Sequence, residues 1–150
     1  MFLAQQRVYR SIDHERIKKA IAEAERNTSG EIRVSIAPFF WGSVEAAARM
    51  AFERLGMQAT RDRNAILFFV VPGRRRFTVL GDEGIHAKVG PEFWKSVVAA
   101  VQGPFRKGDF TEGLVQGIAA VGRELGAHFP FDGKTDVNEL PDDVDLGPDR

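Results

Sequence analysis

The feature that most constrains the fold is a continuous apolar run at 65–71, Ala-Ile-Leu-Phe-Phe-Val-Val. It is rich in β-branched and aromatic residues, and Pro72-Gly73 close it. A run this short and this apolar is typical of a strand buried on both faces of an α/β sheet. It is far shorter than the about 20 residues that a membrane-spanning helix needs. A strand buried on both faces requires helices above and below it.

The rest of the chain supplies those helices and two further strands. Apolar residues recur at helical spacing in 12–26, 43–56, the segment from Pro91 to a stop at Gly103-Pro104, and 110–128. The segments 31–37 and 76–80 alternate with period two, and 31–37 is predicted to have one wetter face. The unit 31–71 predicts a parallel crossover, whereas the short turn at 72–75 allows only an antiparallel return. The sequence therefore predicts an α/β fold, a Rossmann-like three-layer α/β/α sandwich around a small mixed sheet.

Local signals mark where these helices begin and how they pack. Asp13 and Ser43 are predicted N-caps, and Asp109 with Glu112 three residues later predicts an aspartate version of a capping box. Glycines recur along the last predicted helix at spacings of four, five and four, which favours close contact with a neighbouring helix: Gly113, Gly117, Gly122 and Gly126.

The chain changes character after residue 131. Residues 132–150 hold seven acidic side chains against two basic ones, a net charge of −5, so residues 1–131 carry +5 within a neutral chain. We interpret 1–131 as one α/β/α domain and 132–150 as a mostly extended acidic tail. Val137, Leu140 and Val144 are spaced so that they could dock the tail on the domain.

Composition narrows the function classes. The absence of cysteine excludes structural disulfides, thiolate metal sites and cysteine-dependent phosphatases. Zero net charge gives no global electrostatic case for a nucleic-acid or membrane partner. The first residues lack the apolar core of a signal peptide, so a cytoplasmic location is expected.

The predicted topology brings acidic residues together at one end of the sheet. The starts of 31–37 and 65–71 share that end with the finish of 76–80. Glu31, Asp62, Asp82 and Glu83 should therefore meet there. Clustered carboxylates suit a hard cation, calcium or alternatively magnesium. The other interpretation is a set of ion pairs with nearby arginines.

Two further surface features have more than one interpretation. Arg74, Arg75 and Arg76 form a basic turn at the opposite end of the sheet, which is either a solvated hairpin tip or a patch for phosphate or nucleic acid. The aromatic loop at 39–41 is either a plug over the core or the wall of a binding cleft.

Four motifs in fixed order resemble the TPM domain family. They are Thr-Ser-Gly-Glu-Ile-Arg-Val at 28–34, Arg-Asn-Ala-Ile-Leu-Phe-Phe-Val at 63–70, Gly-Asp-Glu-Gly-Ile at 81–85, and Phe-Arg-Lys-Gly-Asp-Phe at 105–110. The resemblance covers roughly 12–129. Ala65 stands where the family usually has glycine, and 81–84 is shorter than the usual Gly-Tyr-Gly-Leu-Glu-Gly loop.

The resemblance implies a three-layer α/β/α fold and several functions. The family includes a thylakoid acid phosphatase, proteins linked to photosystem repair, and membrane-tethered proteins with no known catalysis. Calcium binding near the acidic loops is known in the family. Carried over by position, the implied metal ligands are Asp62, Asp82, Glu83 and Asp109.

Two hypotheses follow from these residues and the resemblance. The first is a divalent-cation-binding interaction domain without catalysis. The second is a metal-assisted phosphatase for phosphomonoesters, in which a metal held by Asp62 or Asp82 activates water while Arg63 or Lys107 binds the phosphate. The sequence shows no side-chain nucleophile with a paired base, which favours the interaction domain.

Overall fold

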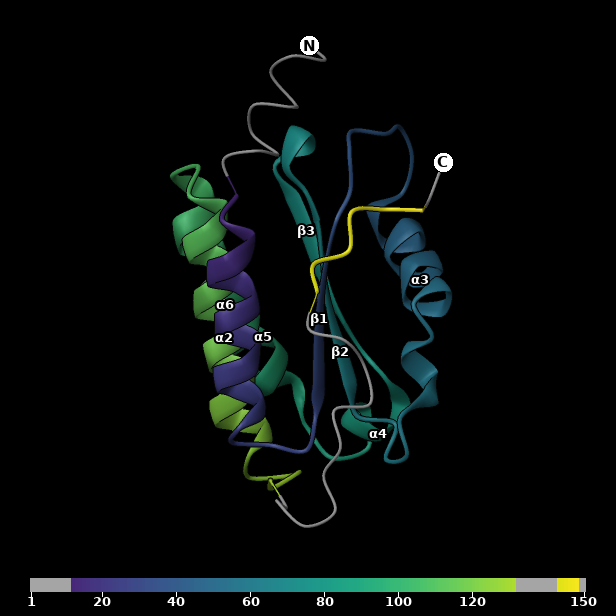
Figure 1. Cartoon of the computed structure of the whole chain (residues 1–150), viewed down its shortest axis with the longest axis vertical. Helices are drawn as coiled ribbons and strands as arrows, with labels where there is room; N and C mark the ends of the chain where they lie inside the picture. The colour runs from purple at the N-terminus through teal and green to yellow at the C-terminus, as the bar shows by residue number, and fades with distance from the viewer. Residues whose placement is uncertain (1–11, 132–142, 149–150) are drawn as a thin grey trace.

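The computed structural model describes residues 12–131 and 143–148, which form three layers. Helices α2, α5 and α6 cover one face of the sheet and α3 covers the other (Figure 1). This arrangement confirms the predicted α/β class. In order, the elements are α2 (His14–Glu25), β1 (Glu31–Ile36), α3 (Val44–Arg54), η1 (Met57–Ala59), β2 (Ala65–Val71), η2 (Pro72–Arg74), β3 (Arg76–Gly81), α4 (Glu83–His86), α5 (Pro91–Arg106) and α6 (Phe110–Leu125).

The sheet is mixed, as predicted, and its described strands lie in the order β1-β2-β3. Strands β1 and β2 run parallel, with Glu31 opposite Ala65. Strands β2 and β3 run antiparallel, with Ile66 opposite Gly81. The start of β1, the start of β2 and the finish of β3 therefore share one end of the sheet.

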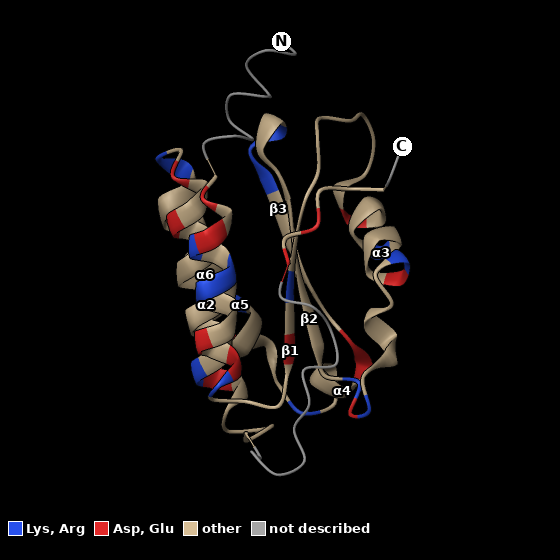
Figure 2. Ribbon diagram, in the orientation of Figure 1, with Lys and Arg blue, Asp and Glu red and all other residues tan. Residues whose placement is uncertain are grey.

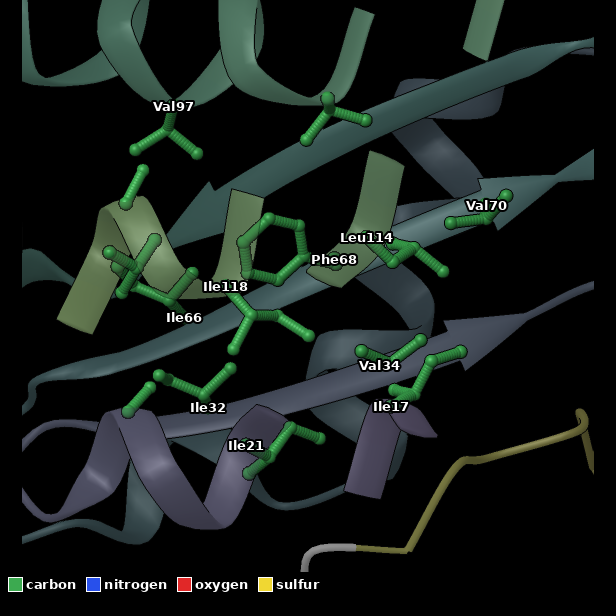
Figure 3. Packing of buried hydrophobic residues seen from close by; sticks show 14 of the residues in the cluster. Ile17, Ile21, Ile32, Val34, Ile66, Phe68, Val70, Val97, Leu114 and Ile118 are labelled. Atoms are coloured by element: carbon green, nitrogen blue, oxygen red, sulfur yellow. The ribbon is translucent and has the colours of Figure 1, made fainter. Parts of the chain in front are cut away.

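The central strand β2 is buried along its whole length. Ile66, Phe68 and Val70 face the layer of α2, α5 and α6, and Figure 3 shows Phe68 between strand side chains and Ile118 of α6. The alternate residues Leu67 and Phe69 pack against the α3 side. The continuous apolar run is thus explained by two cores that share one strand.

Glycines allow α6 to lie close to its neighbours. A Cβ atom on Gly117 would lie 2.4 Å from Cγ2 of Val101 and 3.0 Å from Cε1 of Phe68. A Cβ atom on Gly122 would lie 2.8 Å from the Cβ of Ala24 in α2. The predicted role of this glycine series in close packing is confirmed for α5, β2 and α2.

The predicted helix starts are confirmed. The side chains of Asp13, Ser43 and Asp109 each accept a hydrogen bond from the backbone N–H three residues on, at 3.0–3.1 Å. Glu112 does not complete a reciprocal box, because its carboxylate accepts hydrogen bonds from Gln116 and Arg16. These two hydrogen bonds lower the pKa of Glu112.

The predicted stop at Gly103-Pro104 is wrong, because α5 continues to Arg106. The extra turn is held by aromatic packing. Phe105 contacts Phe77 at 5.0 Å and Phe110 at 4.9 Å between ring centroids, which ties the end of α5 to β3 and α6. Tertiary packing of this side chain outweighs the local helix-breaking preference of proline.

The C-terminal segment 143–148 docks on the outer edge of β1. The backbone N–H of Asp145 donates to Val34, and the backbone oxygen of Asp145 accepts from Ile36. Val144 packs against the core, as predicted, whereas Val137 and Leu140 lie outside the described residues. This segment also corrects the prediction of a wet face on β1, since Arg33 and Ser35 are buried and bonded to Asp143 and Asp145.

Candidate functional site

The acidic residues that were predicted to meet do lie at the same end of the sheet. Figure 2 shows acidic and basic segments together there, beside α4. Asp62 lies in the loop before β2, and Asp82 and Glu83 directly follow β3. Glu31 begins β1 and is buried, with only 3% of its surface exposed. The contacts of these residues decide between a cation site and ion pairs.

Asp82 is held by Arg63. Its Oδ2 accepts from Nε of Arg63 at 2.6 Å, and its Oδ1 accepts from Nη2 at 2.9 Å. Oδ1 also accepts from the backbone N–H of Glu83 at 2.8 Å, which caps α4. Asp82 is only 6% exposed, so both of its carboxylate oxygens are satisfied by protein donors. This geometry is a two-point arginine–carboxylate pair.

The same arginine joins the two loops into one unit. Its Nη1 donates to Glu83 at 3.1 Å, and its backbone oxygen accepts from the N–H of Gly84 at 2.9 Å. The hydrogen bond to Asp82 raises the pKa of Arg63. Only glycine fits at position 84, because a Cβ atom there would lie 2.2 Å from the backbone oxygen of Asp62. Arg63, Asp82 and Glu83 therefore form one ion-paired unit, the Arg63 clamp, that ties the loop before β2 to the loop after β3.

The implied ligand set for calcium does not come together. Within residues 12–131 and 143–148, no three histidine or acidic side chains gather closely enough to hold a metal ion. Asp62 is half-exposed and lies 3.4 Å from Nη2 of its neighbour Arg61. The described side chains alone therefore form no cluster of three ligands, and calcium or magnesium binding near these loops stays a prediction.

Asp109 and Lys107 lie at the other end of the sheet from Asp82. Phe110 follows Asp109 and reaches Phe77 near the start of β3 through Phe105. Strand β3 is six residues long, so its last residue is five steps from its first, and at about 3.3 Å per residue the two ends lie roughly 17 Å apart. Arg63 and Lys107 therefore cannot bind one phosphate together.

A groove lies between β3 and α5 and was not predicted from the sequence. Its volume is about 550 Å³. Phe77, Val79, Trp94, Val98 and Phe105 give it an apolar and aromatic lining. The remaining lining residues are polar or basic: Thr78, Gln102, Arg75, Arg76 and Arg106.

The basic side chains of the groove gather at the start of β3, where Figure 2 shows a blue segment. Arg76 forms an ion pair with Glu45 at 3.0 Å. Arg75 and Arg106 are exposed and form no ion pair with another described residue. Both interpretations of the basic turn, a solvated hairpin tip and a patch for phosphate or nucleic acid, stay predictions. Arg74 instead holds the aromatic loop through the backbone oxygens of Phe40 and Gly42.

Comparison with known families identifies the chain. The TPM domain model matches residues 6–124, most of the sequence. The chain belongs to the TPM domain family. The BA42 protein of the psychrophilic bacterium Bizionia argentinensis is 36% identical to it, with a TM-score of 0.85 over 91% of this chain and 95% of that chain. No curated protein matches the chain.

Two more distant structures share the TPM fold. The N-terminal domain of cg2496 from Corynebacterium glutamicum is 13% identical, with a TM-score of 0.59 over 91% of this chain and 79% of that domain. The N-terminal domain of a protein from P. gingivalis is 18% identical, with a TM-score of 0.60 over 74% and 72%. Among the described helices, none is long and apolar enough to cross a membrane.

Proposed function

We propose that this TPM domain acts as a binding domain that contacts a partner, and that it does not hydrolyse phosphate esters. The observation that carries the proposal is the groove beside β3, whose lining combines aromatic side chains with Arg75 and Arg106, two arginines that pair with no carboxylate among the described residues. Exposed aromatic and arginine side chains are the residue types that contribute most energy to protein interfaces.

The placement of the candidate catalytic residues also supports binding over phosphatase activity. Asp82 already accepts two hydrogen bonds from Arg63 and one from the N–H of Glu83, and at 6% exposure its carboxylate has little access to a water molecule. Lys107, the second candidate for phosphate, lies at the far end of the sheet from Arg63 and Asp82. Phosphate-ester hydrolysis needs its charged groups around one reacting phosphorus atom.

A phosphatase assay tests this proposal. The purified chain and its Asp62→Asn variant are incubated with para-nitrophenyl phosphate, with and without millimolar calcium or magnesium. We expect both to release nitrophenol at the rate of the buffer alone. Metal-dependent turnover by the parent that Asp62→Asn abolishes would overturn the proposal and restore the phosphatase hypothesis.

Calcium binding stays a prediction that the described side chains do not favour. Asp62 is the best residue to substitute in a calcium-binding test, because its carboxylate pairs with Arg61 and not with Arg63. Calcium that bound only the folded chain would raise the melting temperature of the parent and leave that of Asp62→Asn unchanged. A cytoplasmic location likewise stays a prediction, to be tested by fractionating cells that express the full chain.

A further inference from the structure

The backbone of the β1 edge is hydrogen-bonded to other parts of the chain, whereas no described strand pairs with the β3 edge. At the β1 edge, the N–H of Ile32 donates to the carboxylate of Glu25 at 2.8 Å, and the backbone of Asp145 pairs with Val34 and Ile36. At the β3 edge, no strand of the described chain pairs with the backbone. An open edge strand presents a row of hydrogen-bonding groups to any extended segment that reaches it.

The register of the sheet shows which groups of β3 are open. The N–H of Asp82 donates to Ala65 of β2, which fixes the alternation of the antiparallel ladder. Arg76, Thr78 and Leu80 therefore bond toward β2. The backbone N–H and C=O groups of Phe77, Val79 and Gly81 point to the free edge.

The groove lies directly beside this open edge. Phe77 and Val79 contribute both the open backbone groups and apolar groove wall, and Trp94 and Val98 of α5 form the opposite wall. A strand added to β3 would thus place every second side chain in the groove, since side chains alternate between the two faces of a sheet.

The positive charge at one end of the groove predicts acidic residues in the added strand. Arg75 and Arg106 stand at the end of the groove near the start of β3, without a carboxylate partner among the described residues. A strand that ends in carboxylates would pair with both guanidinium groups, while its apolar residues fill the groove.

We propose that the β3 edge and its groove bind an extended, acidic segment of a partner protein by strand addition. The segment carries apolar side chains at alternate positions and acidic residues beside Arg75 and Arg106. This inference rests on the proposed binding function and specifies its ligand. It gives the basic turn a role in binding. The acidic loop takes no part in this site, because it lies at the other end of the sheet.

Fluorescence anisotropy with a synthetic peptide tests the proposal. The probe is fluorescein-labelled Glu-Asp-Val-Thr-Val-Thr-Val-Asp-Glu, whose acidic ends suit either strand direction. One control peptide replaces its four acidic residues by lysine. A second carries N-methyl groups on alternate backbone nitrogens, which removes the hydrogen bonds of strand pairing. We expect saturable binding of the probe and, for each control, affinity at least about tenfold weaker.

Matched protein variants locate the binding surface. Val98→Glu places a carboxylate in the groove, whereas Ala99→Glu adds the same charge one residue away on the exposed side of α5. The double variant Arg75→Asn, Arg106→Gln removes the two positive charges at the end of the groove, and Arg49→Gln removes an exposed arginine on α3. We expect Val98→Glu and the double variant to weaken binding by at least about fivefold, and both controls to change it less than about twofold. Melting curves check that each variant is folded.

Four outcomes would overturn the proposal. The first is that the probe does not bind at about 1 mM protein, and the second is that the N-methylated peptide binds as tightly as the probe. The third is that the parent dimerises through the groove and Val98→Glu makes it monomeric. The fourth is that the probe binds tightly only after removal of residues 1–11 or 132–150. The last two would assign the groove to a second copy or to the chain's own ends. If the chain neither binds the peptide nor hydrolyses phosphate esters, this ligand is rejected and the proposed binding function stands. If the chain hydrolyses phosphate esters, the proposed function itself is rejected.

Discussion

Asp145 is predicted to fasten the C-terminal segment to the domain, and its replacement should lower stability measurably. Its side chain is 10% exposed. The carboxylate accepts from Nη2 of Arg54 at 2.7 Å, from Nη1 of Arg54 at 3.1 Å and from Oγ of Ser35 at 2.8 Å. Hydrogen bonds to a charged group contribute about 1.5–3 kcal/mol each, but those on one group are not additive. Because Arg54 is one-third exposed, solvent screens part of the interaction.

We therefore expect Asp145→Ala to lower the free energy of unfolding by about 2–3 kcal/mol. For a chain of this size that corresponds to a fall in melting temperature of roughly 5–10 °C in differential scanning calorimetry. Asp143→Ala is the matched control, because its side chain is 73% exposed and its carboxylate pairs with Lys18 alone among the described residues. An Asp145→Ala variant that melts with the control would refute the inference that this carboxylate fastens the segment.

The same ion pair predicts a pH dependence. Burial raises the pKa of Asp145, but hydrogen bonds from Arg54 and Ser35 outweigh it, so the pKa lies below its ordinary value of 3.8. The stabilisation is therefore complete above that ordinary value and is lost as the pH falls through the lower pKa of the folded state. The difference in unfolding free energy between the parent and Asp145→Asn should shrink as the pH falls below about 4.

Substitutions at four further positions test other parts of the structure. Gly117→Ala should lower the free energy of unfolding by about 1–2 kcal/mol, because the added methyl group would crowd Val101 and Phe68. Gly103→Ala should raise the free energy of unfolding by up to about 1 kcal/mol, because position 103 has open space around it. Urea denaturation of both variants measures the two opposite changes. Asp109→Ala should lower the unfolding free energy by about 0.5–2 kcal/mol and Asp109→Asn by only a few tenths, since asparagine also caps. Asp82→Ala should lower the melting temperature more than Asp82→Asn, because asparagine can still accept from the N–H of Glu83.

Much of the fold could be predicted because its signals are local. The apolar run at 65–71 and the caps at Asp13, Ser43 and Asp109 depend on residues close in sequence. The extension of α5 past Pro104 could not be predicted in this way, because it depends on contacts of Phe105 with β3 and α6.

The candidate site was harder to predict because its chemistry depends on long-range pairing. The sequence placed Asp82 near Arg63 but left a cation site and an ion pair open, and only the bond geometry selects the ion pair. The docking of Asp145 joins residues 110 positions apart and has no strand pattern of its own. The groove depends on how β3 packs beside α5, which the sequence does not show, although Arg75 was already marked there as part of a basic turn.

One measurement tests the central claim, that this TPM domain binds through the β3 groove while its acidic loop is a structural clamp. An isotope-labelled chain is titrated in parallel with the acidic peptide and with calcium, and its backbone amide signals are followed by NMR. We expect the peptide to shift the signals of Phe77, Val79 and Gly81 saturably, and calcium to leave those of Asp62 and Glu83 in place. Saturable calcium shifts at Asp62 and Glu83, with no response of β3 to the peptide, would contradict the account.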